Sequence, residues 1–505
     1  MRKRYLLLSL LLIFVLPATA QIVQPGRYEV KLEPFDNYFT IIPAGEDGLL
    51  MVRPTNETNA LGENEWEFIK LDTALQEEWQ KKYYVDTKFH FTGYDYHDEQ
   101  AYLLFNNGPY VKDNLTLMQV DMETQTPDFI EIPKEFAIEL TEYEMVGESV
   151  LLGGYVNYRP TVILYHLPSK KFKVLPGFYM DRSELLQLEI DDDKEIFRVL
   201  TTTRTLDKNN TINIKTFDKS GELIINLTLK PNKDVNLLDG RSTGISQNSQ
   251  YVAGTYSQIR SAKKGKESYS IGIYVARLDA NGEQLINYYN YADLDNFFNY
   301  MKAGKQKRIK RKIERRKIKG KELRFNYRLI VRNIINHEDG NHILLGEAYY
   351  PVYSNQSFNP LIGSSTRANL SGFRYTHAVL FCFDEKGNHL WDNSFEINDV
   401  TSYNLEKYVH VDKHKDKLVL LYNFENVIRS KIIKGNEVIE GKSFDDIVLK
   451  FEDDVAKEED NEMGGLKSWY DDNFYAYGIQ HIRNKYQDAV NLRRKVFYVN
   501  KINYQ

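Results

Sequence analysis

Three residues in this 505-residue chain have the types and spacing of metal ligands. His410, Asp412 and His414 alternate along one predicted strand, so two imidazoles and a carboxylate would lie on the same face. The flanking residues from 413 to 417 are almost all charged, which is typical of a polar turn at the start of a strand. We favour the polar turn, and the sequence predicts no metal, no cofactor and no catalytic residue.

A search for local catalytic motifs gives the same result. The chain contains no His-Glu-x-x-His, no Gly-x-Ser-x-Gly and no phosphate-binding glycine loop. Its single cysteine, Cys382, stands between two phenylalanines on an apolar strand, so we expect a buried free thiol and no disulfide. An enzyme that assembles its site from several distant segments would escape this search, so an enzymatic alternative stays open.

The strongest local signal is a basic insertion at about residues 292–326. From Lys302 to Lys321 there are twelve Lys/Arg and one acid, in a chain whose net charge is -5. Asp293 to Met301 is predicted to start a helix anchored by Phe297 and Phe298. Farther on, Ile309 and Ile313 form a thin apolar stripe on a short basic amphipathic helix.

Four interpretations of this helix compete. It could lie on the protein's own acidic surface, with the acidic run between Glu452 and Glu462 as the internal counter-charge. It could be attracted to an anionic membrane surface, or dock to an acidic protein partner. Nucleic acid fits the charge but not an exported protein.

The elements that must position these groups are predicted from a repeat. Five apolar runs end in aspartate, and in three of them a glycine follows three residues later, as in Phe217-Asp218 with Gly221. An apolar strand ending in Asp-x-x-Gly predicts a hairpin in which aspartate caps the turn and glycine adopts a positive φ. A strand-based repeat of about 40 to 50 residues indicates an all-β chain folded as a β-propeller.

We count eight blades, with seven as the alternative. Eight pairs of consecutive apolar strands can be assigned, and the eighth pair ends at the C-terminus without an outer strand. Tyr28 to Leu32 is an unassigned strand of suitable character, so we expect it to close the last blade. In the seventh unit we assign the second strand to Leu418–Leu421 and the third to Ile447–Phe451, with Asn423–Asp446 as an inserted loop.

The other insertions are predicted on the same face as the basic helix. Those between the second and third strands of a blade are Ser257–Ser270 and Tyr350–Thr376, and those between blades are Ala292–Asn326 and Asp453–Lys467. Both kinds of connection emerge on one face of a propeller. Loops carried on a regular scaffold are a common place for function.

The run Phe383-Asp384-Glu385-Lys386-Gly387 to Trp391 resembles the docking repeat of quinoprotein-like propellers, and Leu71-Asp72 to Trp79 is a weaker copy. The resemblance is to the quinoprotein-like or WD40-like propeller superfamily and implies an eight-bladed propeller. Trp391-Asp392 opens an outer strand, so the WD40 signature is not met. A single cysteine excludes the disulfide of quinoprotein dehydrogenases, and the better analogue is a non-enzymatic scaffold of the BamB type.

The first twenty residues predict an export signal: Arg2, Lys3 and Arg4, then an apolar run, then Ala18-Thr19-Ala20. Residues 21–505 would then form one propeller domain in the periplasm or envelope, possibly extracellular, with no transmembrane span in the mature chain. We predict a non-enzymatic scaffold that binds an envelope protein or an anionic membrane surface; the alternative is a hydrolase or lyase acting on an extracellular glycan. The predicted binding residues are Lys307, Arg308, Lys310, Arg311, Arg315, Arg316, Tyr350, Tyr353, Phe358 and Phe373.

Overall fold

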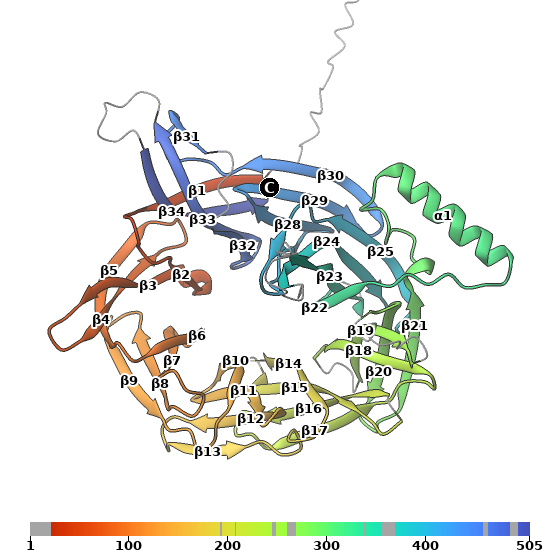
Figure 1. Cartoon of the computed structure of the whole chain (residues 1–505), viewed down its shortest axis with the longest axis horizontal. Coiled ribbons are helices and arrows are strands. Elements are labelled where there is room, and N and C mark those ends of the chain that lie inside the picture. Colours follow the sequence, from red (N-terminus) through yellow and green to blue (C-terminus); the bar gives the residue numbers. More distant parts are fainter. Residues whose placement is uncertain are drawn as a thin grey trace, which may run out of the picture.

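The chain folds into an eight-bladed β-propeller with one α-helix outside the ring (Figure 1). The computed structural model describes residues 22–191, 194–207, 209–244, 249–259, 269–337, 340–354, 369–457, 463–484 and 493–504. The predicted export signal lies outside these residues. Within them, no helix is both long and apolar enough to cross a membrane.

Blades 1 to 4 are regular four-stranded antiparallel sheets, and their strands follow the chain from the axis outward. Their strands are β2 (Thr40–Pro43), β3 (Leu49–Thr58), β4 (Glu63–Leu71) and β5 (Glu77–Asp86); β6 (His90–His97), β7 (Gln100–Asn106), β8 (Leu115–Asp121) and β9 (Pro127–Ile132); β10 (Glu139–Val146), β11 (Ser149–Val156), β12 (Arg159–His166) and β13 (Lys171–Val174); β14 (Ser183–Asp191), β15 (Ile196–Arg204), β16 (Asn210–Asp218) and β17 (Leu223–Leu229).

Blades 5 to 7 keep this order and carry the additions. Their strands are β18 (Val235–Ser242), β19 (Ser249–Gln258), β20 (Gly272–Asp279) and β21 (Gln284–Asn290); β22 (Arg328–Asn336), β23 (His342–Ser354), β24 (Asn369–Phe383) and β25 (His389–Glu396), with β26 (Thr401–Ser402) beside β24; β27 (His410–His414), β28 (Lys417–Phe424), β29 (Val427–Lys434) and β30 (Glu437–Asp446). Between blades 5 and 6 lie the short 3-10 turn η4 (Tyr291–Asp293) and the helix α1 (Ala303–Ile318).

Blade 8 joins the two ends of the chain. Both β31 (Asp454–Ala456) and β32 (Gly464–Ser468) pair with β33 (Asn473–Asn484), which pairs with β34 (Arg493–Tyr504). The N-terminal strand β1 (Ile22–Leu32) is the outer strand, with Tyr28 opposite Val499. The predicted closure by the N-terminal strand is confirmed, and it covers the edge that β34 would otherwise expose.

The aspartate turns work as predicted. The Oδ1 atom of Asp384 accepts the backbone N–H groups of Lys386 and Asn388, at 2.9 and 2.8 Å, while Gly387 adopts a φ of +75°. This turn then contacts the preceding blade, because the carbonyl of Gly387 accepts the Tyr289 hydroxyl at 2.6 Å. The same side chain therefore shapes a hairpin and positions it against the neighbouring blade.

Side chains near the axis also tie successive blades together. In each case a polar side chain on the inner strand of one blade accepts a backbone N–H from the inner strand of the next. The pairs are Asp95 with Met145, Gln187 with Ser242, and Asp239 with Val331. These bonds satisfy backbone groups that would otherwise lack a partner between sheets.

Blade 7 corrects the sequence assignment. Its third strand is Val427–Lys434, not Ile447–Phe451, and the residues assigned to an inserted loop form two complete strands. A two-residue turn at Glu425 and Asn426, both with positive φ, joins β28 to β29. Glu-Asn is not a usual hairpin turn sequence, and β30 is largely exposed and polar. The sequence pattern therefore predicts neither this turn nor this strand.

Candidate functional site

The basic helix α1 lies outside the ring, beside β21 and β25 (Figure 1). None of its residues is buried, and its nine Lys and Arg side chains are all exposed. Only Gln306, Ile309 and Ile313 are half-buried, and the two isoleucines pack against the core shared by blades 5 and 6. The apolar stripe therefore faces the protein and the cationic surface faces outward.

The helix starts later than the sequence predicted. Residues 294–301 form turns rather than the first turns of a helix, and α1 begins at Ala303 without a side-chain cap. The segment before the helix is held by the next blade: the buried carboxylate of Asp392 accepts the backbone N–H groups of Asp295 and Asn296 at 2.9 and 2.8 Å. The backbone then forms single turns, with Asn299 N–H donating to the carbonyl of Asn296 and Met301 N–H to that of Phe298.

We call residues 291–301 and 325–327 the base of the insertion. Phe297 and Phe298 are fully buried in it, as predicted for the apolar anchors, and Phe297 stacks on Tyr291 with ring centroids 4.4 Å apart. Tyr327 contacts Phe297 edge to face at 4.9 Å. The base is thus an aromatic cluster that is continuous with the propeller core.

A histidine is buried beneath the base. The His377 ring is fully buried and stacks on Tyr300 with centroids 3.7 Å apart. Burial lowers the pKa of His377 to about 3, so this imidazole is neutral at physiological pH. Aromatic rings and a neutral imidazole therefore form the buried side of the base, and the charged residues of the base, Asp293 and Asp295, are acidic.

No basic side chain of α1 forms an ion pair with any described residue. The predicted internal counter-charge is not in place among the described residues: Asp454 pairs instead with Arg494 at 2.5 Å, in blade 8. Residues 458–462 of that acidic run lie outside the described part. A hollow of about 250 Å³ separates the C-terminal half of α1, at Ile313 and Lys317, from Asn290 and Asp293.

The β23–β24 hairpin is the second element of the predicted site. Residues expected in a loop continue both strands, with Tyr350 opposite Arg374 and Tyr353 opposite Leu370. Tyr350 is 44% exposed and Tyr353 54% exposed. Phe373 is only half-buried and contacts Tyr349 edge to face at 5.6 Å, while Phe358 lies outside the described residues.

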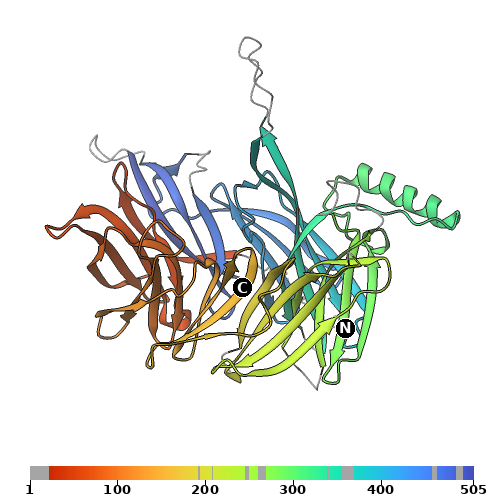
Figure 2. The same ribbon diagram turned by 60° about the horizontal axis from the view of Figure 1, so that its bottom comes forward.

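Helix α1 and the end of the β23–β24 hairpin project from the same side of the ring (Figure 2). The structure therefore places α1 on the same side of the ring as the strand ends that carry Tyr350 and Tyr353, and α1 carries Lys307, Arg308, Lys310, Arg311, Arg315 and Arg316. We call this side the insert face. The sequence argument for a shared face followed from strand order, and the hairpin and helix agree with it.

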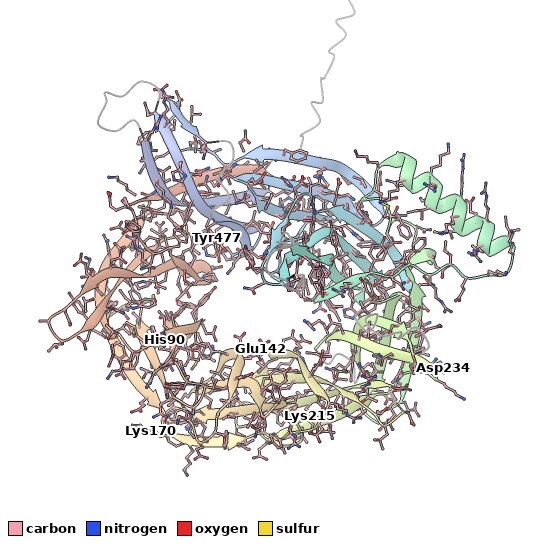
Figure 3. The ribbon with its side chains drawn as sticks, viewed as in Figure 1. His90, Glu142, Lys170, Lys215, Asp234 and Tyr477 are labelled. Atoms are coloured by element: carbon pink, nitrogen blue, oxygen red, sulfur yellow. The ribbon has the colours of Figure 1, made fainter. Side chains whose placement is uncertain are left out.

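The side chains near the axis are polar and aromatic. Lys467 donates to the Tyr94 hydroxyl at 3.3 Å, across blade 1, whose inner strand has only four residues. Glu347 is fully buried; it accepts Arg332 at 2.6 Å and the backbone N–H of Val409 at 2.7 Å. Figure 3 places Tyr477 and Glu142 on opposite sides of the axis.

The alternating residues of β27 have separate partners. His410 faces Ser468 at 3.3 Å and His414 faces Asp472 at 3.0 Å. Burial, followed by the cations Lys407, Lys467 and Arg332, lowers the pKa of His410 to about 3. Among the described residues no three His, Cys, Asp or Glu side chains are grouped so as to hold a metal ion. Cys382 is buried and free, and burial raises its pKa to about 12.

A scan of protein-family models and a search of curated proteins both gave no match to this chain. Solved structures resemble it in fold. The β-propeller domain of the Trilobed protease from Pyrococcus furiosus is 11% identical with a TM-score of 0.35, and the alignment covers 81% of this chain and 93% of that one. The polysaccharide lyase Uly1 is 9% identical with a TM-score of 0.40, covering 82% and 90%. Likeness at this level assigns no function to the chain.

Proposed function

We propose that this chain is an exported, non-enzymatic propeller scaffold of the cell envelope, and that its insert face binds an acidic protein partner. The observation that carries the proposal is α1: nine cationic side chains stand exposed on a helix held by a buried aromatic base, without an ion pair to any described residue. The Asp384 to Trp391 repeat resembles that of quinoprotein-like propellers, and the single cysteine excludes the disulfide of their dehydrogenases, which favours a non-enzymatic scaffold.

Two features favour a protein over a membrane surface. The apolar stripe of α1 is used against the propeller, so the helix has no free apolar face to enter a lipid interface. Exposed Tyr350 and Tyr353 on the same face, together with arginines, match the composition of protein–protein interfaces. An anionic lipid surface could therefore attract α1 only through its charges, without apolar insertion.

The test is affinity capture from the envelope fraction with the mature chain and two variants. In the first variant, Lys307, Arg308, Lys310, Arg311, Arg315 and Arg316 become Gln, which keeps the helix propensity while removing six charges. In the matched control, six exposed lysines away from the insert face become Gln: Lys81 on the outer strand of blade 1, and Lys170, Lys171, Lys219, Lys386 and Lys415 in or beside turns of the opposite face.

We expect one acidic protein to be retained by the mature chain and the control, and lost with the α1 variant. Binding of the purified partner should weaken by at least about tenfold in the α1 variant and should fall as salt rises, because exposed charges are screened. Retention by both variants would overturn the proposal. Binding of the mature chain to phosphatidylglycerol vesicles with no protein retained would move the partner from protein to membrane.

A further inference from the structure

The opposite face of the ring carries a second, chemically different site. The ends of the inner strands β14, β18 and β22 surround a cavity of about 430 Å³. Because an inner strand starts at the insert face and ends at the other, this cavity opens on the side away from α1. Its volume falls in the range typical of small-molecule sites.

The charged groups that line the cavity, in the part of the chain that the structure describes, balance one another. Arg198 is only 3% exposed, and its Nη2 lies 2.9 Å from Oε2 of Glu189 while its Nη1 lies 3.5 Å from Oδ2 of Asp191. Lys194 completes the group, with Nζ 3.2 Å from the same Asp191 oxygen. Among the described lining residues, two cations stand against two carboxylates, so these four charges cancel.

Two buried polar atoms in the described part of the lining lack a hydrogen-bond partner. One is Nη1 of Arg198, whose 3.5 Å contact with Asp191 is an ion pair without hydrogen-bond geometry; the other is Oγ of Ser242, whose hydroxyl can both donate and accept. Buried polar groups are almost always hydrogen-bonded, so an unpartnered pair in the wall of one cavity suggests that a ligand supplies the partners.

We propose that this cavity binds a neutral, hydroxyl-rich small molecule such as a monosaccharide. Each hydroxyl of such a ligand donates one hydrogen bond and accepts two, so it can serve Arg198 and Ser242 and also donate to Glu189 and Asp191. A cationic ligand would be repelled by Arg198 and Lys194, and an anionic ligand by Glu189 and Asp191. The inference is independent of the insert face and of its partner.

Gly244 offers a substitution that blocks the cavity without removing its ion pairs. A Cβ atom built at Gly244 lies 3.7 Å from Nη1 of Arg198 and 3.8 Å from both Oδ2 of Asp191 and Nζ of Lys194. These are ordinary van der Waals distances, so Gly244→Ala should be accommodated. A longer side chain, as in Gly244→Leu, would cover the three charged groups.

The experiment is ligand-observed NMR with the mature chain and a panel of probes: glucose, galactose, mannose, xylose and N-acetylglucosamine, with glucuronate and inorganic phosphate as charged comparisons. We expect at least one neutral sugar to bind the mature chain and Gly244→Ala, and to bind Gly244→Leu at least about tenfold more weakly. The α1 variant with six Gln should bind as the mature chain does.

Three outcomes would overturn the proposal. None of the neutral sugars binds the mature chain at millimolar concentration, or the bound sugar is retained by Gly244→Leu, or only glucuronate or phosphate binds. Melting curves of both Gly244 variants, recorded without ligand, separate loss of the site from loss of the fold.

Discussion

Helix α1 and its base are consecutive parts of one insertion, and they differ in almost every physical respect. The helix is exposed and cationic, with nine basic side chains and one acid. The base is largely buried and aromatic, with Phe297 and Phe298 inside the core and a neutral His377 stacked beneath Tyr300, and its charged residues, Asp293 and Asp295, are acidic. The chain thus combines a surface that contributes little to folding with an attachment that contributes much.

This contrast indicates how a scaffold can present charge. Exposed like charges on one helix repel one another, by tenths of a kcal/mol, and do not order a flexible loop by themselves. Aromatic packing at the base holds the insertion against the core, and the Asp392 contacts with Asp295 and Asn296 fasten the segment before the helix to blade 6. The base therefore determines geometry, and the helix is left free to carry the charge.

The largest effect should come from opening the base. Phe297→Ala removes a fully buried ring that contacts Tyr291, Tyr327 and His377. We expect the free energy of unfolding to fall by about 3–5 kcal/mol, as for other buried phenylalanines truncated to alanine. Chemical denaturation monitored by tryptophan fluorescence measures the change.

The matched control lies on the helix itself. Ile318 is 85% exposed, so Ile318→Ala should change the free energy of unfolding by less than about 0.5 kcal/mol. If Phe297→Ala cost no more than Ile318→Ala, the base would not hold the helix to the core, and the contrast between the two parts would be lost.

The next largest effect is the loss of folding stability at low pH. The pKa of His377 is lowered to about 3 in the folded chain, whereas an unfolded histidine titrates near 6.5. The unfolded state therefore binds the extra proton, and this contribution to stability is complete above about pH 6.5 and is lost as pH falls toward 3. Between those values His377 should contribute a slope of about 1.4 kcal/mol per pH unit.

His377→Phe keeps a ring against Tyr300 and removes the proton-binding site. We expect this variant to lose less stability than the wild type between pH 6 and pH 4, measured by denaturation at each pH. His410 and His342, whose pKa values are also lowered by burial, supply the remaining histidine slope. The control is His90→Phe at an exposed position of β6, which tests whether a histidine-to-phenylalanine change alone alters the slope (Figure 3). Equal slopes in all three proteins would show that His377 is not buried as a neutral ring.

Much of the ring could be predicted because its signals are local. An aspartate that caps its own turn and an alternating apolar strand are properties of four to eight residues, so the turns at Asp218 and Asp384 and the closing strand at Tyr28 were all assigned from the sequence. The buried anchors Phe297 and Phe298 could also be predicted, because two adjacent large apolar side chains beside an exposed run of cations are expected to be buried against the protein core.

What could not be predicted depends on contacts between distant residues. The segment before α1 is bound by Asp392, almost a hundred residues away in sequence from Asp295. The cavity beside Arg198 is lined by residues from three inner strands. No short sequence motif predicts that Glu189, Ser242 and Gly244 lie close together. Blade 7 was misassigned for a third reason, because its Glu425-Asn426 turn uses residues that are uncommon in that conformation.

Replacement of the cationic residues of α1 should have the smallest effect on stability, although it should have the largest effect on partner binding. Replacing the six predicted cationic residues of α1 by Gln removes like-charged pairs at i and i+4, such as Lys307 with Arg311 and Arg311 with Arg315. Each such pair is destabilising by about 0.2–0.5 kcal/mol, and Gln has nearly the same helix propensity as Lys and Arg. The variant should therefore unfold within about 1 kcal/mol of the wild type, and the difference should favour the variant.

The same denaturation experiment, at low and at high salt, tests this expectation. Added salt screens exposed charges, so the gain over the wild type should shrink as salt rises. A loss of several kcal/mol would mean that the cations are bound to acidic groups of the propeller itself, because only paired charges stabilise a fold when they are intact. In that case α1 would belong to the core of the scaffold and would not be available to a partner.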